Sequence, residues 1–272
     1  MGPGLGEVDR LVPWDSPGLA PLWTDGAATA GPGGHQLPAF DAGVAYTRSP
    51  HLLVRLSERI PRLRSLDPVP PPGAGHAASW YASAVASWGH AVDPVPPLRP
   101  GKDESQCALR LAAGLPSGFI AIHPGSGSPR KNWPSSRFAE LLRRLAPGEP
   151  WLLIEGPADA DAAAPLRRLG GAVVHRDLPP RILAALLGRA GVYVGNDSGI
   201  SHLAAAVGIP TIALFGPTDP EVWSPVGPQV TAIRSQDGTM DGIPVEPVQD
   251  AVARWRSAAG DPALTRMRLI RR

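Results

Sequence analysis

From residue 119 onward, short apolar runs alternate with amphipathic segments. The runs contain almost no polar residues, whereas the segments between them place apolar residues at helical spacing, as Ile182, Leu183 and Leu186 do. Continuous apolar strands are typical of a parallel sheet buried on both faces, and the amphipathic segments are typical of the helices that cover it. The predicted strands are 119–123, 151–155, 172–175, 192–195, 211–215 and 230–233, and the predicted helices are 103–113, 136–145, 160–169, 179–189 and 199–207.

The first hundred residues have a weaker pattern and are interrupted by clusters of glycine and proline at 31–34, 68–75 and 94–101. Trp80, Ala84 and Trp88 recur at helical spacing and are expected to fill a core. The predicted strands here are 8–13 and 42–46, and the predicted helices are 50–56 and 76–89. We therefore expect the second half of the chain to form a doubly wound, Rossmann-like domain.

The composition excludes several classes of function. With 26 basic and 24 acidic residues the net charge is only +2, which argues against a nucleic-acid partner. The single cysteine, Cys107, excludes an intrachain disulfide, and neither a signal peptide nor an apolar run of transmembrane length is evident. We expect a cytoplasmic protein. Lysine occurs only at Lys102 and Lys131, so it is not used as a general surface residue.

In a sheet of this kind ligands bind beyond the carboxyl ends of the strands. The first loop of interest runs from His123 to Pro134 and contains Ser126, Gly127 and Lys131. Glycine allows backbone N–H groups to approach an anion, the hydroxyl adds a donor and the lysine adds a positive charge, which together suit a phosphate. The P-loop spacing is absent, and an ordinary solvated turn remains the alternative.

The second loop follows the strand at 192–195 and leads into a helix. Asp197 or Ser198 can cap that helix, and Ser198 and Gly199 leave N–H groups at its electropositive end, where an anion can bind. His202 follows Ser198 by four residues and so lies on the same helix face. A purely structural histidine is the alternative, but its place beside the anion seat favours a role in the site.

Two further segments carry weaker signals. Asp159 and Asp161 follow the strand at 151–155 and could hydrogen-bond a ribose, although capping of the next helix is the favoured interpretation. The segment 215–220 follows another strand and is expected to line the same crevice, with a proline-stiffened turn as the alternative.

These motifs resemble those of a known family. HPGSGSPRKNWP followed by SRFAELLRRL, and then VGNDSGISHLAAAVGIPTIALFGPTDPEVWSP, resemble glycosyltransferase family 9, the heptosyltransferases of lipopolysaccharide core assembly. The dense similarity covers residues 119–227, with looser similarity in VDRLVPWD and FDAGVAYTRSP.

The resemblance implies a GT-B fold, an α/β architecture of two Rossmann-like domains with parallel sheets, of which the N-terminal one is expected to be incomplete. The implied domains are a partial acceptor-side domain over 1–115, a nucleotide-sugar donor-binding domain over 116–255 and a C-terminal helical tail over 256–272. It also implies that Ser126, Gly127 and Lys131 contact the donor diphosphate. By the same resemblance Asp197, Ser198, Gly199 and His202 seat the pyrophosphate on a helix N-terminus. Asp159 stands where the family often has a glutamate that contacts the adenosine ribose.

The implied reaction is an inverting, metal-independent transfer from a nucleotide-sugar, ADP-heptose above all, to a lipid-linked saccharide at the inner membrane, with no separate cofactor. Lys131 and His202 would stabilise the leaving diphosphate. The family's base is an Asp in a G-x-x-G-D-like loop, and Gly4–Glu7 only echoes that motif, so the catalytic base is unassigned and Glu7 is not expected to fill the role. This favours as an alternative a nucleotide-sugar-binding fragment without transfer activity. A nicotinamide dehydrogenase is disfavoured because no G-x-G-x-x-G follows a strand.

Overall fold

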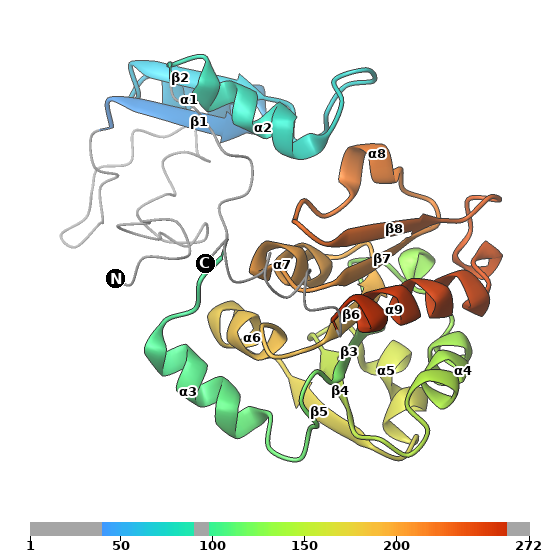
Figure 1. Cartoon of the computed structure of the whole chain (residues 1–272). Coiled ribbons are helices and arrows are strands. Elements are labelled where there is room, and N and C mark those ends of the chain that lie inside the picture. Colours follow the sequence, from blue (N-terminus) through green and yellow to red (C-terminus); the bar gives the residue numbers. More distant parts are fainter. Residues whose placement is uncertain (1–39, 90–97, 260–272) are drawn as a thin grey trace. The chain divides into compact units, whose positions relative to one another are not determined.

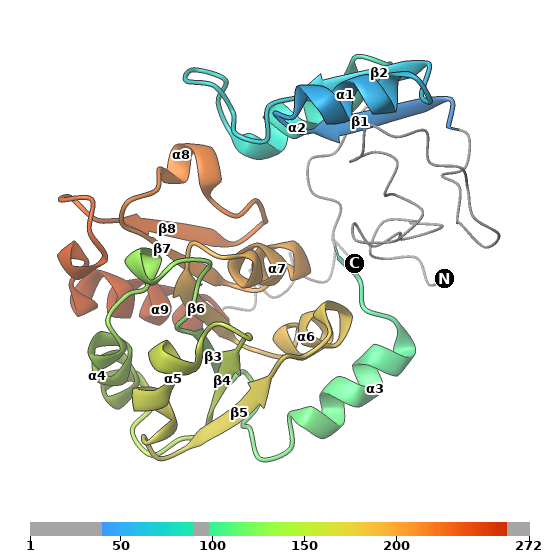
Figure 2. The same cartoon turned by 180° about the vertical axis from the view of Figure 1, so that it is seen from behind.

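The computed structural model describes residues 40–89 and 98–259 (Figures 1 and 2). The chain divides near residue 94 into a smaller and a larger compact unit. Of the described residues, 40–89 belong to the smaller unit and 98–259 to the larger unit, which includes the helix predicted over 103–113. The strand predicted at 8–13 and the tail beyond residue 259 lie outside the described residues.

The smaller unit contains a two-stranded parallel sheet with a crossover helix. In this sheet the strands are in a register that pairs Ala42 with Arg62 and Tyr46 with Leu66. Strand 42–46 and the two helices are confirmed, whereas the second strand was not predicted because Arg62 and Arg64 interrupt its apolar pattern. The elements are β1 (Ala42–Tyr46), α1 (Pro50–Ser57), β2 (Arg62–Leu66) and α2 (Ala77–Ala86).

The predicted aromatic core of α2 is only partly correct. Ala84 is buried, but Trp80 and Trp88 are half-buried, and their rings make polar contacts. Trp80 Nε1 donates a hydrogen bond to the Asp67 carbonyl at 2.9 Å, and the Arg62 guanidinium lies 5.8 Å from the centre of the Trp88 ring. The amphipathic character of tryptophan accounts for these positions at the edge of the core.

The larger unit is built on a six-stranded parallel sheet with the order β5-β4-β3-β6-β7-β8 among the described residues (Figure 1). All six strands predicted from the apolar runs are confirmed. The strands are β3 (Ile120–His123), β4 (Trp151–Glu155), β5 (Ala172–Arg176), β6 (Val192–Asn196), β7 (Thr211–Phe215) and β8 (Val230–Arg234). The helices are α3 (Lys102–Leu111), α4 (Ser135–Leu145), α5 (Ala160–Arg167), α6 (Pro180–Leu187), α7 (Gly199–Val207), α8 (Pro220–Trp223) and α9 (Val245–Ala259).

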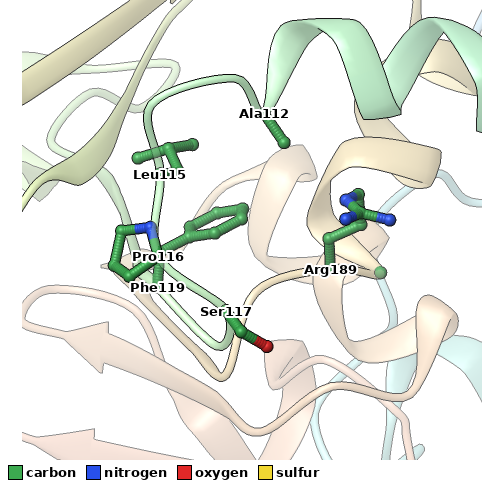
Figure 3. A pocket seen from close by; sticks show the side chains of 7 residues that line it. Ala112, Leu115, Pro116, Ser117, Phe119 and Arg189 are labelled. Atoms are coloured by element: carbon green, nitrogen blue, oxygen red, sulfur yellow. The ribbon is translucent and has the colours of Figure 1, made fainter.

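One face of this sheet is covered by α3, α6 and α7. Ala108, Leu186 and Ala204 of these helices pack with the strand residues Ala121 and Tyr193. At the amino end of β3 a pocket of about 350 Å³ opens on this side (Figure 3). It is lined by Ala112, Leu115, Pro116, Ser117, Phe119, Gly188 and Arg189.

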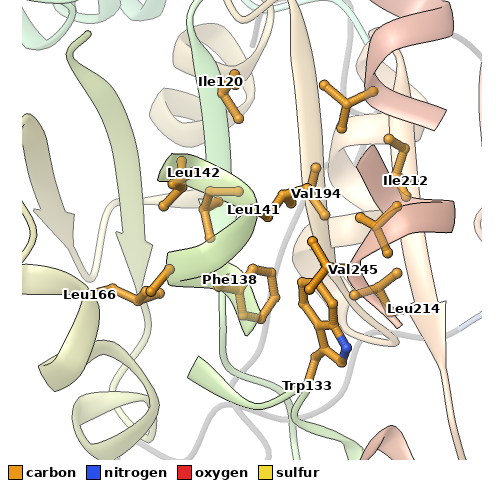
Figure 4. Packing of buried hydrophobic residues seen from close by; sticks show 14 of the residues in the cluster. Ile120, Trp133, Phe138, Leu141, Leu142, Leu166, Val194, Ile212, Leu214 and Val245 are labelled. Atoms are coloured by element: carbon orange, nitrogen blue, oxygen red, sulfur yellow. The ribbon is translucent and has the colours of Figure 1, made fainter. Parts of the chain in front are cut away.

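The other face is covered by α4, α5 and α9, and its core is shown in Figure 4. Ile120 and Ile122 face this side because successive residues of a strand point to opposite faces. The Phe138 ring packs edge-on against Trp133, with 4.8 Å between ring centres. Residues of α9 complete the layer, and this helix begins at residue 245, in a stretch where the sequence pattern indicated no element.

The strand order creates the crevice. The chain passes from β3 outward through β4 to β5 and then returns to place β6 on the other side of β3. The loops after β3 and β6 therefore leave in opposite directions, and their first residues lie side by side at the carboxyl edge. His123 pairs with Gly195 at this switch point.

We expect Phe138→Ala to destabilise the larger unit by about 3–5 kcal/mol, because it empties a fully buried position and removes the contact with Trp133. Urea unfolding measures the loss. Leu109→Ala is the matched control: its side chain is 54% exposed on α3, and the change should stay within about 0.5 kcal/mol. Equal effects of the two substitutions would contradict this core.

Candidate functional site

Three loops of the larger unit converge on the carboxylate of Asp197, which lies directly after β6. Lys131, from the short turn Pro129–Lys131 after β3, places Nζ 3.1 Å from Asp197 Oδ2. The Thr218 hydroxyl, from the loop after β7, donates to the same oxygen at 2.9 Å. Asp197 is 8% exposed, so its charge is compensated within the protein. The two loops singled out in the sequence thus meet.

Asn196, the last residue of β6, fixes the loop that carries Lys131. Its side chain is fully buried, and its Oδ1 accepts from the Trp133 backbone N–H at 3.0 Å. Its Nδ2 donates to the carbonyls of Pro124 and Gly125 at 2.7 and 3.2 Å. One amide therefore holds both ends of the loop between β3 and α4.

The start of α7 has the geometry of an anion seat. Ser198 is its N-cap in extended conformation, and the Ser198 hydroxyl accepts from the Ser201 N–H. The backbone N–H groups of Gly199 and Ile200 have no acceptor among the residues that the structure describes. Free N–H groups and the helix dipole both favour a negative charge at this position.

Ser126 and Gly127 lie at the turn of the first loop, as expected. The Ser126 hydroxyl is engaged within the loop, 2.7 Å from Asn132 Oδ1 and accepting from the Ser128 N–H at 3.2 Å. Gly127 is exposed, and a Cβ there would meet open space. Ser126 therefore shapes the loop, and Gly127 leaves its backbone accessible.

Asp159 is directed into the protein. Only 5% exposed, it accepts from the Gly156 N–H at 2.7 Å and lies 2.8 Å from His123 Nε2. The hydrogen bond from His123 lowers the pKa of the Asp159 carboxyl despite the opposing effect of burial. A Cβ on Gly125 would overlap this carboxylate. Asp159 occupies the N-cap position of α5, but its side chain forms no capping hydrogen bond. Its carboxylate instead contacts the His123 ring and the Gly156 N–H.

His202 lies in the first turn of α7, one turn after Ser198, and its side chain is exposed. Its backbone N–H donates to the Ser198 carbonyl at 3.3 Å. Lys131 contacts Asp197, which immediately precedes the start of α7. Lys131 and His202 therefore lie at the same edge of the sheet. Their roles in binding stay predictions.

Sequence reasoning missed the residues that connect the loops, His123, Asn196 and Thr218. His123 and Asn196 each end an otherwise apolar strand and are buried, at 3% and 0% exposure. A polar residue that ends an apolar run was the available signal, because such a residue lies at the carboxyl edge. Asp161, at the start of α5, is exposed.

The geometry defines a class of protein: a Rossmann-like unit that presents a lysine and a helix N-terminus at its switch point. The model of the family "Glycosyltransferase family 9 (heptosyltransferase)" matches residues 72–243. The match covers more than half of the chain, and the chain belongs to this family.

Relatives with this similarity include lipopolysaccharide heptosyltransferase 3 of Escherichia coli, 32% identical over 125 residues, which are 42% of this chain and 35% of that protein. The chain thus matches about a third of this relative's length. Among solved structures, the glycosyltransferase family 9 protein of Veillonella parvula has a TM-score of 0.68 and 19% identity, covering 80% of this chain and 74% of that one. E. coli ADP-heptose lps heptosyltransferase II has a TM-score of 0.64 and 20% identity, covering 79% and 76%. The predicted α/β fold class of GT-B type with parallel sheets is confirmed.

We expect Asp159→Asn to lower the free energy of unfolding by about 1–3 kcal/mol near neutral pH, because a buried charge-assisted hydrogen bond is lost. The folded-state pKa of Asp159 is lowered, so its stabilisation is present above the unfolded pKa and disappears as the pH falls through the folded value. The gap between wild type and variant should therefore begin to close as the pH falls below about 4.

Urea titrations at pH 7 and pH 3, roughly the two sides of the carboxyl titration, measure this gap. Asp161→Asn, at an exposed position in the first turn of the same helix, is the control, and its effect should stay near 0.5 kcal/mol or below. A gap that is independent of pH would rule out the ionised Asp159 partner.

Proposed function

We propose that the carboxyl edge of the larger unit binds the diphosphate of a nucleotide-sugar and that the chain takes part in glycosyl transfer. The observation that carries the proposal is the 3.1 Å contact between Lys131 and Asp197, which joins the lysine-bearing loop to the start of α7. An ammonium group has three donors, so Lys131 can hold Asp197 and still donate to a phosphate. The N–H groups of Gly199 and Ile200 supply further donors.

The donor we propose is ADP-heptose or a related nucleotide-sugar. The support is membership of family 9 and the similarity to proteins named as heptosyltransferases. The acceptor we propose is a lipid-linked saccharide of the lipopolysaccharide-core type at the cytoplasmic side of the inner membrane. Within residues 40–89 and 98–259, none of the helices combines the length and the hydrophobicity that a bilayer-spanning segment requires.

Negative charge develops on the departing diphosphate as the bond to the anomeric carbon breaks. Lys131 and the electropositive start of α7 can stabilise that charge without a metal, because both are in place before the reaction. His202, one turn further along, can add a donor. An inverting transfer also needs a group that takes the proton from the attacking acceptor hydroxyl.

A second candidate function is nucleotide-sugar binding without transfer. It is favoured by the pairing of three buried carboxylates at this edge. Asp197 is held by Lys131 and Thr218, and Asp159 is held by His123. Glu155, at the end of β4, accepts from two arginines. All three carboxylates are buried and paired, which disfavours them as bases, and Glu7 lies outside the described residues.

Titration calorimetry with ADP and ADP-heptose, followed by an assay of sugar transfer to a lipid-linked acceptor, separates the two candidates. Binding with turnover supports the transferase, and binding without turnover supports the binding module. The absence of binding to either ligand would remove both.

Lys131→Ala should weaken ADP binding by about 1–3 kcal/mol, because it removes a charge-assisted contact to the diphosphate. Calorimetry measures the change. Lys102, the only other lysine in the sequence, is exposed at the start of α3, and Lys102→Ala should leave the affinity unchanged. Unchanged binding by the Lys131 variant would exclude this lysine from the site.

His202→Ala should weaken ADP binding by about 0.5–1.5 kcal/mol, the contribution of one hydrogen bond. Because the side chain is exposed, the free energy of unfolding should change by no more than about 0.5 kcal/mol. Calorimetry and urea unfolding measure the two quantities. A large loss of stability with normal affinity would instead show that His202 is structural.

A further inference from the structure

A buried histidine lies directly beneath the start of α7. His123, the last residue of β3, is 3% exposed and contacts a side chain through each ring nitrogen. Its Nε2 lies 2.8 Å from Asp159 Oδ2, and its Nδ1 lies 3.3 Å from Ser198 Oγ. The three side chains come from β3 and from the N-caps of α5 and α7. His123 therefore connects two helix starts across the carboxyl edge.

The direction of these hydrogen bonds follows from their chemistry. Asp159 has a lowered pKa, so its carboxylate is ionised and can only accept. The hydrogen between the two residues must then be on His123 Nε2. In the neutral imidazole Nδ1 carries a lone pair and accepts the hydroxyl hydrogen of Ser198.

The neighbouring hydroxyls favour the same arrangement. The Ser201 hydroxyl donates its hydrogen to the Asn196 carbonyl, so Ser201 Oγ can only accept from its other neighbours. Tyr193 OH lies 3.1 Å from Ser201 Oγ and can fill that position. His123 Nδ1 is then the acceptor left for the Ser198 hydrogen, because Ser201 Oγ can already accept from Tyr193.

We propose that His123 is a positioning residue for the diphosphate site and acts through Ser198. With the Ser198 hydrogen directed at His123, the oxygen lone pairs face the Ser201 N–H and cap the helix. This fixes the start of α7 at Gly199, so that the N–H groups of Gly199 and Ile200 point to the anion. The proposal rests on the proposed function and adds to it a residue that does not touch the ligand.

Two isosteric substitutions separate this role from a structural one. His123→Asn places an amide atom near the position of Nδ1 and can still accept from Ser198, while it loses Asp159. His123→Gln reaches the position of Nε2 and can still donate to Asp159, while it loses Ser198. We expect His123→Gln to raise the Kd for ADP about 3- to 10-fold and His123→Asn to retain most of the affinity.

The opposite order, with Asn weaker than Gln, would show that the contact with Asp159 is what matters and would overturn the proposal. His175→Gln is the matched control. It keeps a donor for the Leu111 carbonyl, which His175 Nε2 contacts at 2.8 Å on the edge strand β5, and should leave the Kd unchanged.

A double-mutant cycle tests whether His123 acts through Ser198. In a Ser198→Ala background, His123→Gln should have no further effect on the Kd, because the hydroxyl it positions is absent. Additive effects of the two substitutions would overturn the proposal. Urea unfolding of the same variants distinguishes affinity from stability.

Nitrogen NMR of the His123 side chain provides a test that needs no ligand. The structure assigns the hydrogen of the neutral ring to Nε2, and a ring with its hydrogen on Nδ1 would overturn the inference. Failure of the wild-type protein to bind ADP or inorganic pyrophosphate would overturn both the proposed function and the role of His123. If the wild-type protein binds normally but the ring hydrogen is on Nδ1, only the role of His123 would be overturned. The same holds if the effects of His123→Gln and Ser198→Ala on the Kd are additive.

Discussion

The carboxylate of Asp197 is the point on which the arrangement of the carboxyl edge depends. A carboxylate that is 8% exposed is costly unless it is paired and hydrogen-bonded. Lys131 and Thr218 provide those partners, and each comes from a different loop. The requirement to compensate one charge therefore brings three strand-to-helix connections together at the proposed nucleotide-sugar site.

The same contact sets the electrostatics of the site. Lys131 is held by an ionic partner before any ligand arrives, so its side chain has lost much of its conformational freedom in advance. An anion at the start of α7 then meets a preorganised donor together with the backbone N–H groups. Asp197 also reduces the net positive charge near the lysine, so binding must rely on the geometry of several donors.

Beneath this layer, buried polar residues provide the support. Asn196 bonds to both ends of the loop that carries Lys131, and His123 connects the start of α7 to Asp159. These residues cannot easily be replaced by apolar ones, because the backbone groups and carboxylate they satisfy would be left without partners. The site is thus positioned from the carboxyl end of the sheet.

The periodicity of the sequence was sufficient for the larger unit's strands, because each strand is buried on both faces and reads as an apolar run. It was insufficient for β2, in which Arg62 and Arg64 occupy positions that the small two-stranded sheet leaves exposed. It also indicated no helix at the start of α9, because Pro247 and the polar residues around it mask the apolar positions that α9 buries at Val248 and Val252.

The sequence by itself determined that two loops rich in small residues follow parallel strands and that one of them carries an isolated lysine. Only the tertiary structure decided the partners: Lys131 meets Asp197 across 66 residues, and Asp159 meets His123 across 36. The physical reason is that helix and strand patterns arise from neighbours in the chain, whereas a charge finds its partner according to strand order. The placement of β4 beside β3 therefore brings Asp159 to His123, and the placement of β6 on the other side of β3 brings Lys131 to the helix start.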